Sequence, residues 1–137
     1  MKEAYVSFKV AKLLKEKGFN EELRTYYNEE GDELELHDDF CNISNSEWDS
    51  NYITYLDFYC VRPTQQMAMQ WLRKEKMIFI SPFPTFKSSP TFKSMLPYSW
   101  RVDIKNCFGE ELGGNYEYIT YEDAVEAALE YVLTYLI

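Results

Sequence analysis

Residues 63–80 of the chain read PTQQMAMQWLRKEKMIFI. Met67 and Trp71 lie four positions apart, which places both on one face of a helix and leaves the glutamines and bases elsewhere. Proline suits the first position of a helix because its φ angle is fixed and it has no amide hydrogen to donate. The pattern therefore predicts a helix over residues 63–76. The short apolar run that follows at 77–80 predicts a central strand buried on both faces.

Two other segments carry helical periodicity. Residues 7–17 place apolar side chains three to four positions apart, with Ser7 as N-cap and Gly18 in the left-handed position after the last turn. Residues 121–136 follow the N-cap Thr120 and carry an unbroken apolar stripe. The stripe consists of Tyr121, Ala124, Val125, Ala128, Val132 and Leu136. We therefore expect three amphipathic helices.

The strands are predicted between these helices. Residues 23–27 and 33–37 flank a polar, glycine-containing turn at 28–32, which favours a hairpin. Residues 98–108 alternate well enough for another strand. Residues 52–61 are rich in aromatic and β-branched side chains, and a further strand there stays open.

These segments predict a single α+β domain over residues 1–137. It would contain a mainly antiparallel sheet of four to five strands with three helices packed on it. The expected order is helix, strand, strand, the open strand, helix, strand, strand, helix. A chain of this length buries roughly two-thirds of its unfolded surface, so it folds without metal or disulfide staples. Its three cysteines contain no CxxC pair and make a poor disulfide framework.

The charged residues are sorted into blocks. Residues 26–60 hold ten acids and no Lys or Arg, residues 61–108 hold eight bases and two acids, and residues 109–137 hold seven acids and no base. The net charge of −9 argues against nucleic acid or anionic membrane as a partner. No apolar run approaches the roughly 20 residues of a membrane span, and a cytoplasmic location is expected. Opposed blocks can also pair between two copies, so a homodimer is a further expectation.

Three segments carry a family resemblance: AKLLKEKGF at residues 11–19, PTQ at 63–65 with WLRKEK at 71–76, and YEDAVEAAL at 121–129. They resemble small uncharacterised proteins encoded by prophages and mobile elements of gut bacteria. The resemblance implies a mobile-element accessory protein. It implies no activity, substrate or site residues.

The only histidine, His37, precedes two aspartates. On an extended strand only His37 and Asp39 point to the same face, and Cys41 could add a ligand. These residues form a weak candidate metal site for a small metal-dependent hydrolase. Zinc usually takes four ligands and the chain has no second histidine, so a solvated acidic turn is the favoured interpretation. We predict no catalytic residue, no metal and no cofactor.

The proline-rich segment at residues 81–97 holds a tandem repeat, PTFKSS followed by PTFKS. Its four prolines oppose a regular strand ladder, so we expect a long loop or ragged edge. The repeat is a candidate binding surface because it sets bases beside aromatic rings, as in single-strand nucleic acid binding. The residues are Phe86, Lys87, Phe92 and Lys93. The favoured alternative is that both phenylalanines fill the core; a protein-binding loop comes next, and nucleic acid last.

Glu122, Glu126 and Glu130 recur every four residues along the last predicted helix. They would lie about 6 Å apart, near the phosphate spacing of one DNA strand, which raises the hypothesis of an acidic DNA mimic that inhibits a host DNA-binding protein. A solvated acidic face is the commoner alternative. The function we expect is that of a non-enzymatic accessory or interaction protein that acts through a protein partner. The hydrolase and the DNA mimic remain alternatives.

Overall fold

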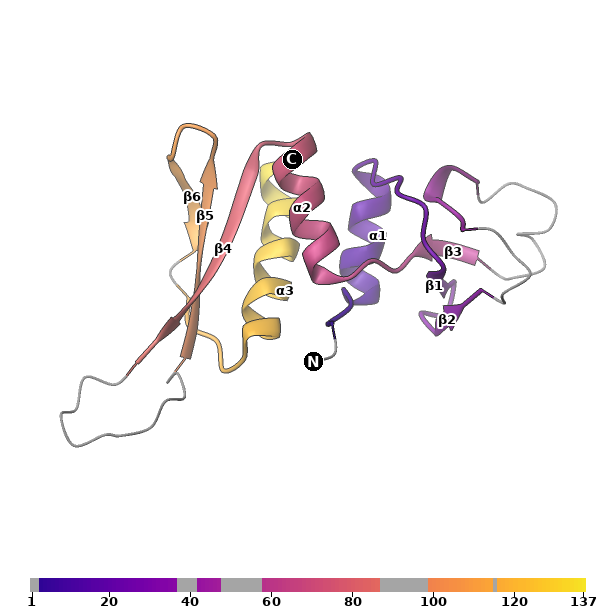
Figure 1. Ribbon diagram of the computed structural model, residues 1–137, viewed down its shortest axis with the longest axis horizontal. Helices are drawn as coiled ribbons and strands as arrows, with labels where there is room; N and C mark the ends of the chain where they lie inside the picture. The colour runs from indigo at the N-terminus through magenta and orange to yellow at the C-terminus, as the bar shows by residue number, and fades with distance from the viewer. Residues whose placement is uncertain (1–2, 37–41, 48–57, 87–98, 115) are drawn as a thin grey trace. The chain divides into compact units, whose positions relative to one another are not determined.

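The computed structural model describes residues 3–36, 42–47, 58–86, 99–114 and 116–137 (Figure 1). The chain divides into two compact units, which are described separately. Unit 1 comprises residues 1–68 with residue 137, and unit 2 comprises residues 69–136.

Unit 1 contains one helix, three strands and a short 3-10 helix. They are α1 (Phe8–Glu16), β1 (Thr25–Asn28), β2 (Glu33–Glu35), η1 (Asn45–Glu47) and β3 (Phe58–Val61). The predicted start of α1 is confirmed, because the Ser7 hydroxyl accepts a hydrogen bond from the Val10 amide at 3.2 Å. Gly18 lies just beyond its end with a φ of 97°, as a left-handed helix terminus requires.

The sheet of unit 1 has the order β2–β1–β3 and is antiparallel throughout. Its hairpin turn is held by Asn28, whose side-chain oxygen accepts hydrogen bonds from the amides of Glu30 and Asp32 at 3.0 and 2.9 Å. The buried Asn45 donates to the Phe19 carbonyl at 2.7 Å and accepts from the Val61 amide at 2.9 Å. Asn45 therefore ties the segment after α1 to β3.

Unit 2 contains most of helix α2 (Gln65–Glu75), three strands and the last helix. They are β4 (Ile78–Thr85), β5 (Ser99–Asn106), β6 (Glu111–Gly114), α3 (Tyr121–Tyr131) and its π-helical continuation η3 (Val132–Leu136). The antiparallel sheet has the order β4–β5–β6. Helix α3 packs against β4 and β5, and it runs beside these two strands in Figure 1. Buried side chains on the facing surfaces are Ile78, Ile80, Val102, Ile104, Ala124 and Ala128.

The β5–β6 pair contains a bulge. Ile104 pairs with Gly113 and Lys105 with Glu111, so Leu112 is the extra residue. Gly114 has a φ of 118°, and a Cβ atom at this position would lie 2.3 Å from the Val102 carbonyl oxygen. The bulge therefore requires glycine at its end.

The α+β class and the three helices are confirmed, but the predicted single sheet of four to five strands is not what the structure shows. The six described strands form two three-stranded sheets. The open strand exists as β3 and pairs with the first hairpin. The sixth strand, β6, is not among the predicted strands, because its two glycines obscure the sequence pattern of a strand that ends in a bulge.

Helix α2 begins two residues later than predicted. The Thr64 hydroxyl accepts a hydrogen bond from the Met67 amide at 3.2 Å, so Thr64 takes the capping role and Pro63 precedes the cap. The start of α2 is decided by the side chain of Thr64, which satisfies a free amide of the first turn. Proline suits the position before the cap as well as it suits the first helical position.

Strand β4 corrects two predictions. It is an edge strand with Phe79 exposed, not a central strand buried on both faces, and it runs through Pro82 and Pro84. Its pairing with β5 is unbroken from Ile78 opposite Asn106 to Thr85 opposite Ser99. The prolines occupy alternate positions, so both lack an amide hydrogen on the same side of the strand. β4 is an edge strand, and that side is its open edge, which is where proline is tolerated in a sheet.

Candidate functional site

Unit 2 contains a pocket of about 410 Å³ between α3 and the sheet. Its floor is apolar and comes from Val102 and Ile104 of β5 and from Ala124 and Ala128 of α3. Pockets that hold a ligand or a side chain span roughly 300–1,000 Å³, so this one is of functional size.

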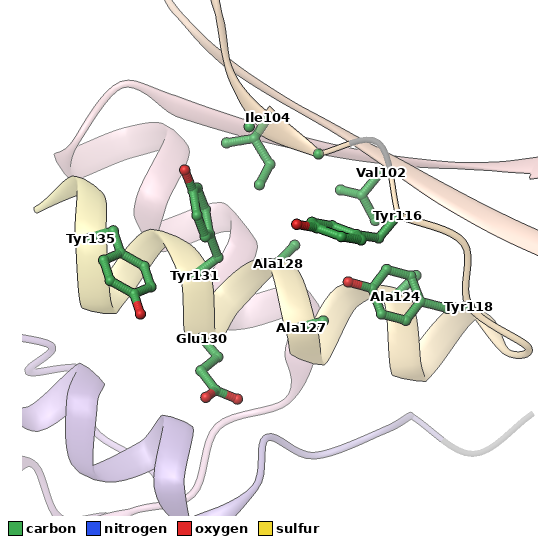
Figure 2. Close-up of a pocket in the computed structure, with 12 residues that line it drawn as sticks. Val102, Ile104, Tyr116, Tyr118, Ala124, Ala127, Ala128, Glu130, Tyr131 and Tyr135 are labelled. Carbon is green, nitrogen blue, oxygen red and sulfur yellow. The ribbon is translucent and has the colours of Figure 1, made fainter.

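Four tyrosines form the walls of this pocket. Tyr116 and Tyr118 come from the segment after β6, whereas Tyr131 and Tyr135 come from α3 and η3. Figure 2 shows the rings of Tyr116 and Tyr131 in the space between α3 and β5, beside Ala128. The ring centroids of Tyr131 and Tyr135 lie 5.4 Å apart at an interplanar angle of 46°, a favourable tilted arrangement.

The ring of Tyr131 is positioned by the backbone of β6. A Cβ atom on Gly113 would lie 2.6 Å from Cε1 of Tyr131, so the ring rests directly on the glycine. The Tyr131 hydroxyl donates a hydrogen bond to the Leu112 carbonyl at 3.4 Å. The bulge and its glycine therefore set this wall of the pocket.

Tyr118 is positioned by a backbone bridge to β5. The amides and carbonyls of Trp100 and Tyr118 exchange two hydrogen bonds of 2.8 Å, and the Trp100 ring meets Tyr121 edge-on at 5.3 Å. Burial raises the pKa of the Tyr118 hydroxyl, and the nearby Tyr116 raises it further. The Tyr118 phenol is therefore protonated and neutral at physiological pH.

Acidic residues predominate over bases around the pocket. Among the described residues, no Lys or Arg lines it, and Glu130 is the one charged residue in its lining. Figure 2 shows the Glu130 side chain extending away from Val102 and Ile104, on the other side of α3 from the ring of Tyr131. The surrounding segment, residues 109–137, carries seven acids and no base.

The lining of the pocket has few polar side chains. Among the described residues it offers tyrosine hydroxyls and one carboxylate, and it contains no His, Cys, Ser, Thr or Lys. Within the ranges of the chain that the structure describes, no three His, Cys, Asp or Glu side chains gather to hold a metal ion.

Among the predicted site residues of the tandem repeat, Phe86 is described and is 60% exposed. The favoured interpretation, that Phe86 fills the core, is therefore wrong. The strand before it continues to Thr85, so Phe86 follows the end of β4 instead of folding inward. The other members, Lys87, Phe92 and Lys93, lie outside the described residues, as do His37, Asp39 and Cys41 of the weak metal site.

The three predicted glutamates lie on α3 but do not form a uniform exposed row. Glu122 is exposed, whereas Glu126 and Glu130 are half-buried. Each takes part in an interaction within the chain. Among the predicted binding residues that the structure describes, Glu130 alone lines the pocket.

None of the four tyrosines was predicted as a site residue. Their spacing carries the signal: Tyr116 and Tyr118 lie two positions apart, which shares a face in extended chain, and Tyr131 and Tyr135 lie four apart, which shares a face on a helix. This spacing predicts two pairs of tyrosines that each share a face, but it does not predict that the two pairs lie close together.

Comparison of the chain with known protein families, with curated proteins and with solved structures finds no match. In the described parts of the chain, none of the helices has the length and apolar character needed to cross a membrane.

Proposed function

We propose that this protein is a non-enzymatic interaction protein that holds a protein partner at the tyrosine-lined pocket of unit 2. The observation that carries the proposal is the pocket itself, with four tyrosine rings around an apolar floor and no catalytic constellation in its lining. Tyrosine is enriched at protein interfaces because it offers a large apolar ring and a polar hydroxyl at low cost in side-chain entropy.

The exposure of the walls supports this proposal. Tyr116 is 71% exposed and Tyr135 is 74% exposed, although both border a preformed hollow. Ile119, which does not line the pocket, is 88% exposed in the same segment. Large apolar side chains gathered in this way beside a hollow are typical of a surface that a partner covers.

The cellular setting belongs to the same proposal. The role of a mobile-element accessory protein is supported by the resemblance of the three helical segments described above. A cytoplasmic location is supported by Cys60 and Cys107, which are both free thiols, the second of them exposed. Exposed free thiols suit a reducing compartment.

Affinity capture from the producing cells tests the proposal. The bait is the tagged full-length protein, the Tyr116→Ala variant, or the matched control Ile119→Ala. Both substitutions remove an exposed apolar side chain of one segment, so their effects on stability are small and similar. We expect one partner to be recovered with the wild type and the control and to be lost with Tyr116→Ala.

Two results would overturn this proposal. Equal recovery of the partner by Tyr116→Ala would place the interface elsewhere. A rise in melting temperature with Mg²⁺, Mn²⁺ or Zn²⁺ that disappears in His37→Ala would instead favour the metal-dependent hydrolase.

A further inference from the structure

We infer that the pocket of unit 2 binds a weakly hydrated organic cation, the guanidinium of an arginine or the head group of an alkylated lysine, presented as a side chain by the partner. The inference rests on the proposed function and specifies the chemistry that the partner must bring.

The aromatic walls provide the first argument. The face of a tyrosine ring carries partial negative charge and attracts a cation placed within about 6 Å of the ring centre. Four such rings line one pocket, and Tyr131 and Tyr135 have their centroids 5.4 Å apart. A cation that enters beside Tyr131 is therefore close to several rings at once, with Tyr116 across the hollow in Figure 2.

The charge of the surroundings provides the second argument. An anionic ligand would find no Lys or Arg among the described residues of the lining. Tyr118 adds a neutral hydroxyl. A cation meets the opposite situation, because residues 109–137, which supply most of the lining, carry seven acids and no base.

The floor then distinguishes between kinds of cation. Val102, Ile104, Ala124 and Ala128 offer no side-chain hydrogen bond to replace lost water. A strongly hydrated ion, such as a metal cation or an unmodified ammonium group, pays a large desolvation penalty on such a surface. Guanidinium and alkylated ammonium groups are weakly hydrated and have apolar faces, so they match both the floor and the rings.

Binding of small probes to the full-length protein tests the inference. Choline is a quaternary ammonium ion, and 3,3-dimethylbutan-1-ol is its neutral isostere of nearly the same shape. We expect choline to shift the amide NMR signals of Tyr116, Ala128 and Tyr131 saturably. The neutral alcohol should have an affinity at least about ten-fold lower than that of choline. Capped arginine and capped trimethyl-lysine, added in parallel, show which side chain fits best.

Variants separate attraction by the ring from simple apolar contact. Tyr116→Phe keeps the ring and should keep choline binding, whereas Tyr116→Leu keeps the apolar bulk and should weaken choline about ten-fold while leaving the neutral alcohol unchanged. Ile119→Ala serves as the control with unchanged binding. Equal affinity for choline and the alcohol would overturn the inference, as would the absence of a saturable shift with all three cations.

This result is independent of the capture experiment. If Tyr116→Ala loses the partner while no cation binds, the proposed function stands and the cation inference fails. If the cations bind at the pocket but Tyr116→Ala captures the partner normally, the pocket chemistry stands and the proposed docking site fails.

Discussion

At the scale of single residues, Gly113 and Gly114 allow β6 to approach its neighbours more closely than any other residue would. Gly113 supports the ring of Tyr131, and Gly114 passes the carbonyl of Val102 in a left-handed conformation. Both contacts lie where the pocket wall meets the sheet. The geometry of the site therefore depends on two positions without side chains.

Replacing Gly114 by alanine should destabilise the protein more than the same change at Gly109. Gly109 has a φ of 79° with open space around it, so alanine there costs about 1–2 kcal/mol for the left-handed conformation. At Gly114 the added Cβ also meets backbone at 2.3 Å, and we expect a further loss of about 2 kcal/mol or more. Urea denaturation measures both, and equal losses would show that the strand shifts without cost.

Cys60 should be chemically inert in the folded protein. Burial raises the pKa of its thiol to about 12, although Lys15 and Lys12 partly oppose the shift. At pH 8 the fraction of Cys60 present as thiolate is therefore on the order of one in ten thousand, and the thiolate is the reactive form. Iodoacetamide labelling with peptide mapping should modify the exposed Cys107 first and Cys60 only after unfolding. Rapid labelling of Cys60 under native conditions would contradict this.

The same thiol makes stability depend on pH in a defined direction. An unfolded cysteine ionises with a pKa of about 8.5, well below the folded value of about 12. Between these values the unfolded chain loses the proton first, so the free energy of unfolding falls as pH rises; below about pH 8 the group contributes no pH dependence. Denaturation curves recorded from pH 8 to 11 give the free energy of unfolding at each pH. This free energy should fall more steeply with pH for the wild type than for Cys60→Ala. Parallel slopes would argue against the buried thiol.

At the scale of elements, side-chain caps decide where the helices begin. The Thr120 hydroxyl accepts a hydrogen bond from the Asp123 amide at 3.0 Å at the start of α3. Thr120→Ala should cost about 1 kcal/mol in the free energy of unfolding, and Thr120→Ser should restore most of it. Ser81→Ala, on the exposed face of β4, is the control with little effect. Chemical denaturation is the measurement, and a neutral Thr120→Ala would mean that water replaces the cap.

The elements also show what sequence reasoning could and could not reach. Helix starts at Ser7 and Thr120 were predictable because capping is local and depends on a few adjacent residues. The start of strand β4 was predicted, but its edge position and its continuation through Pro82 and Pro84 were not. Proline is excluded from a central strand but accepted at an edge, and the position of a strand in its sheet depends on distant pairing. The pocket could not be predicted for the same reason, because its two tyrosine pairs are brought together by the pairing of β6 with β5.

At the scale of the whole molecule, α2 contains the boundary between the two units, which falls after Ala68. A unit of under 70 residues has a small core and is marginally stable by itself. Unfolding either unit would also fray the shared helix. The prediction of a single domain therefore means that both units unfold together.

Two probes can test this cooperativity. Labelling of Cys60 reports on unit 1, and tryptophan fluorescence in a Trp48→Phe background reports on Trp71 and Trp100 of unit 2. We expect the two denaturation midpoints to coincide. Separate midpoints would establish two domains.

The charge blocks contribute to the fold within at least one unit. Arg62 opens the basic block, and its guanidinium lies 3.2 Å from the carboxylate of Glu33 in the first acidic block. The same guanidinium lies 4.0 Å above the ring of Tyr5. One base is therefore engaged by both an acid and an aromatic ring, so the opposed blocks pair within the chain at this point.

The prolines of β4 affect the tendency of the protein to aggregate at high concentration. An edge strand with a full set of free amide hydrogens can recruit the strand of a second molecule and seed fibrous aggregates. Pro82 and Pro84 remove two donors in a row from the open edge while leaving the inner ladder intact. Strand β4 can thus carry exposed phenylalanines, Phe79 and Phe83, without offering its backbone as a template for growth.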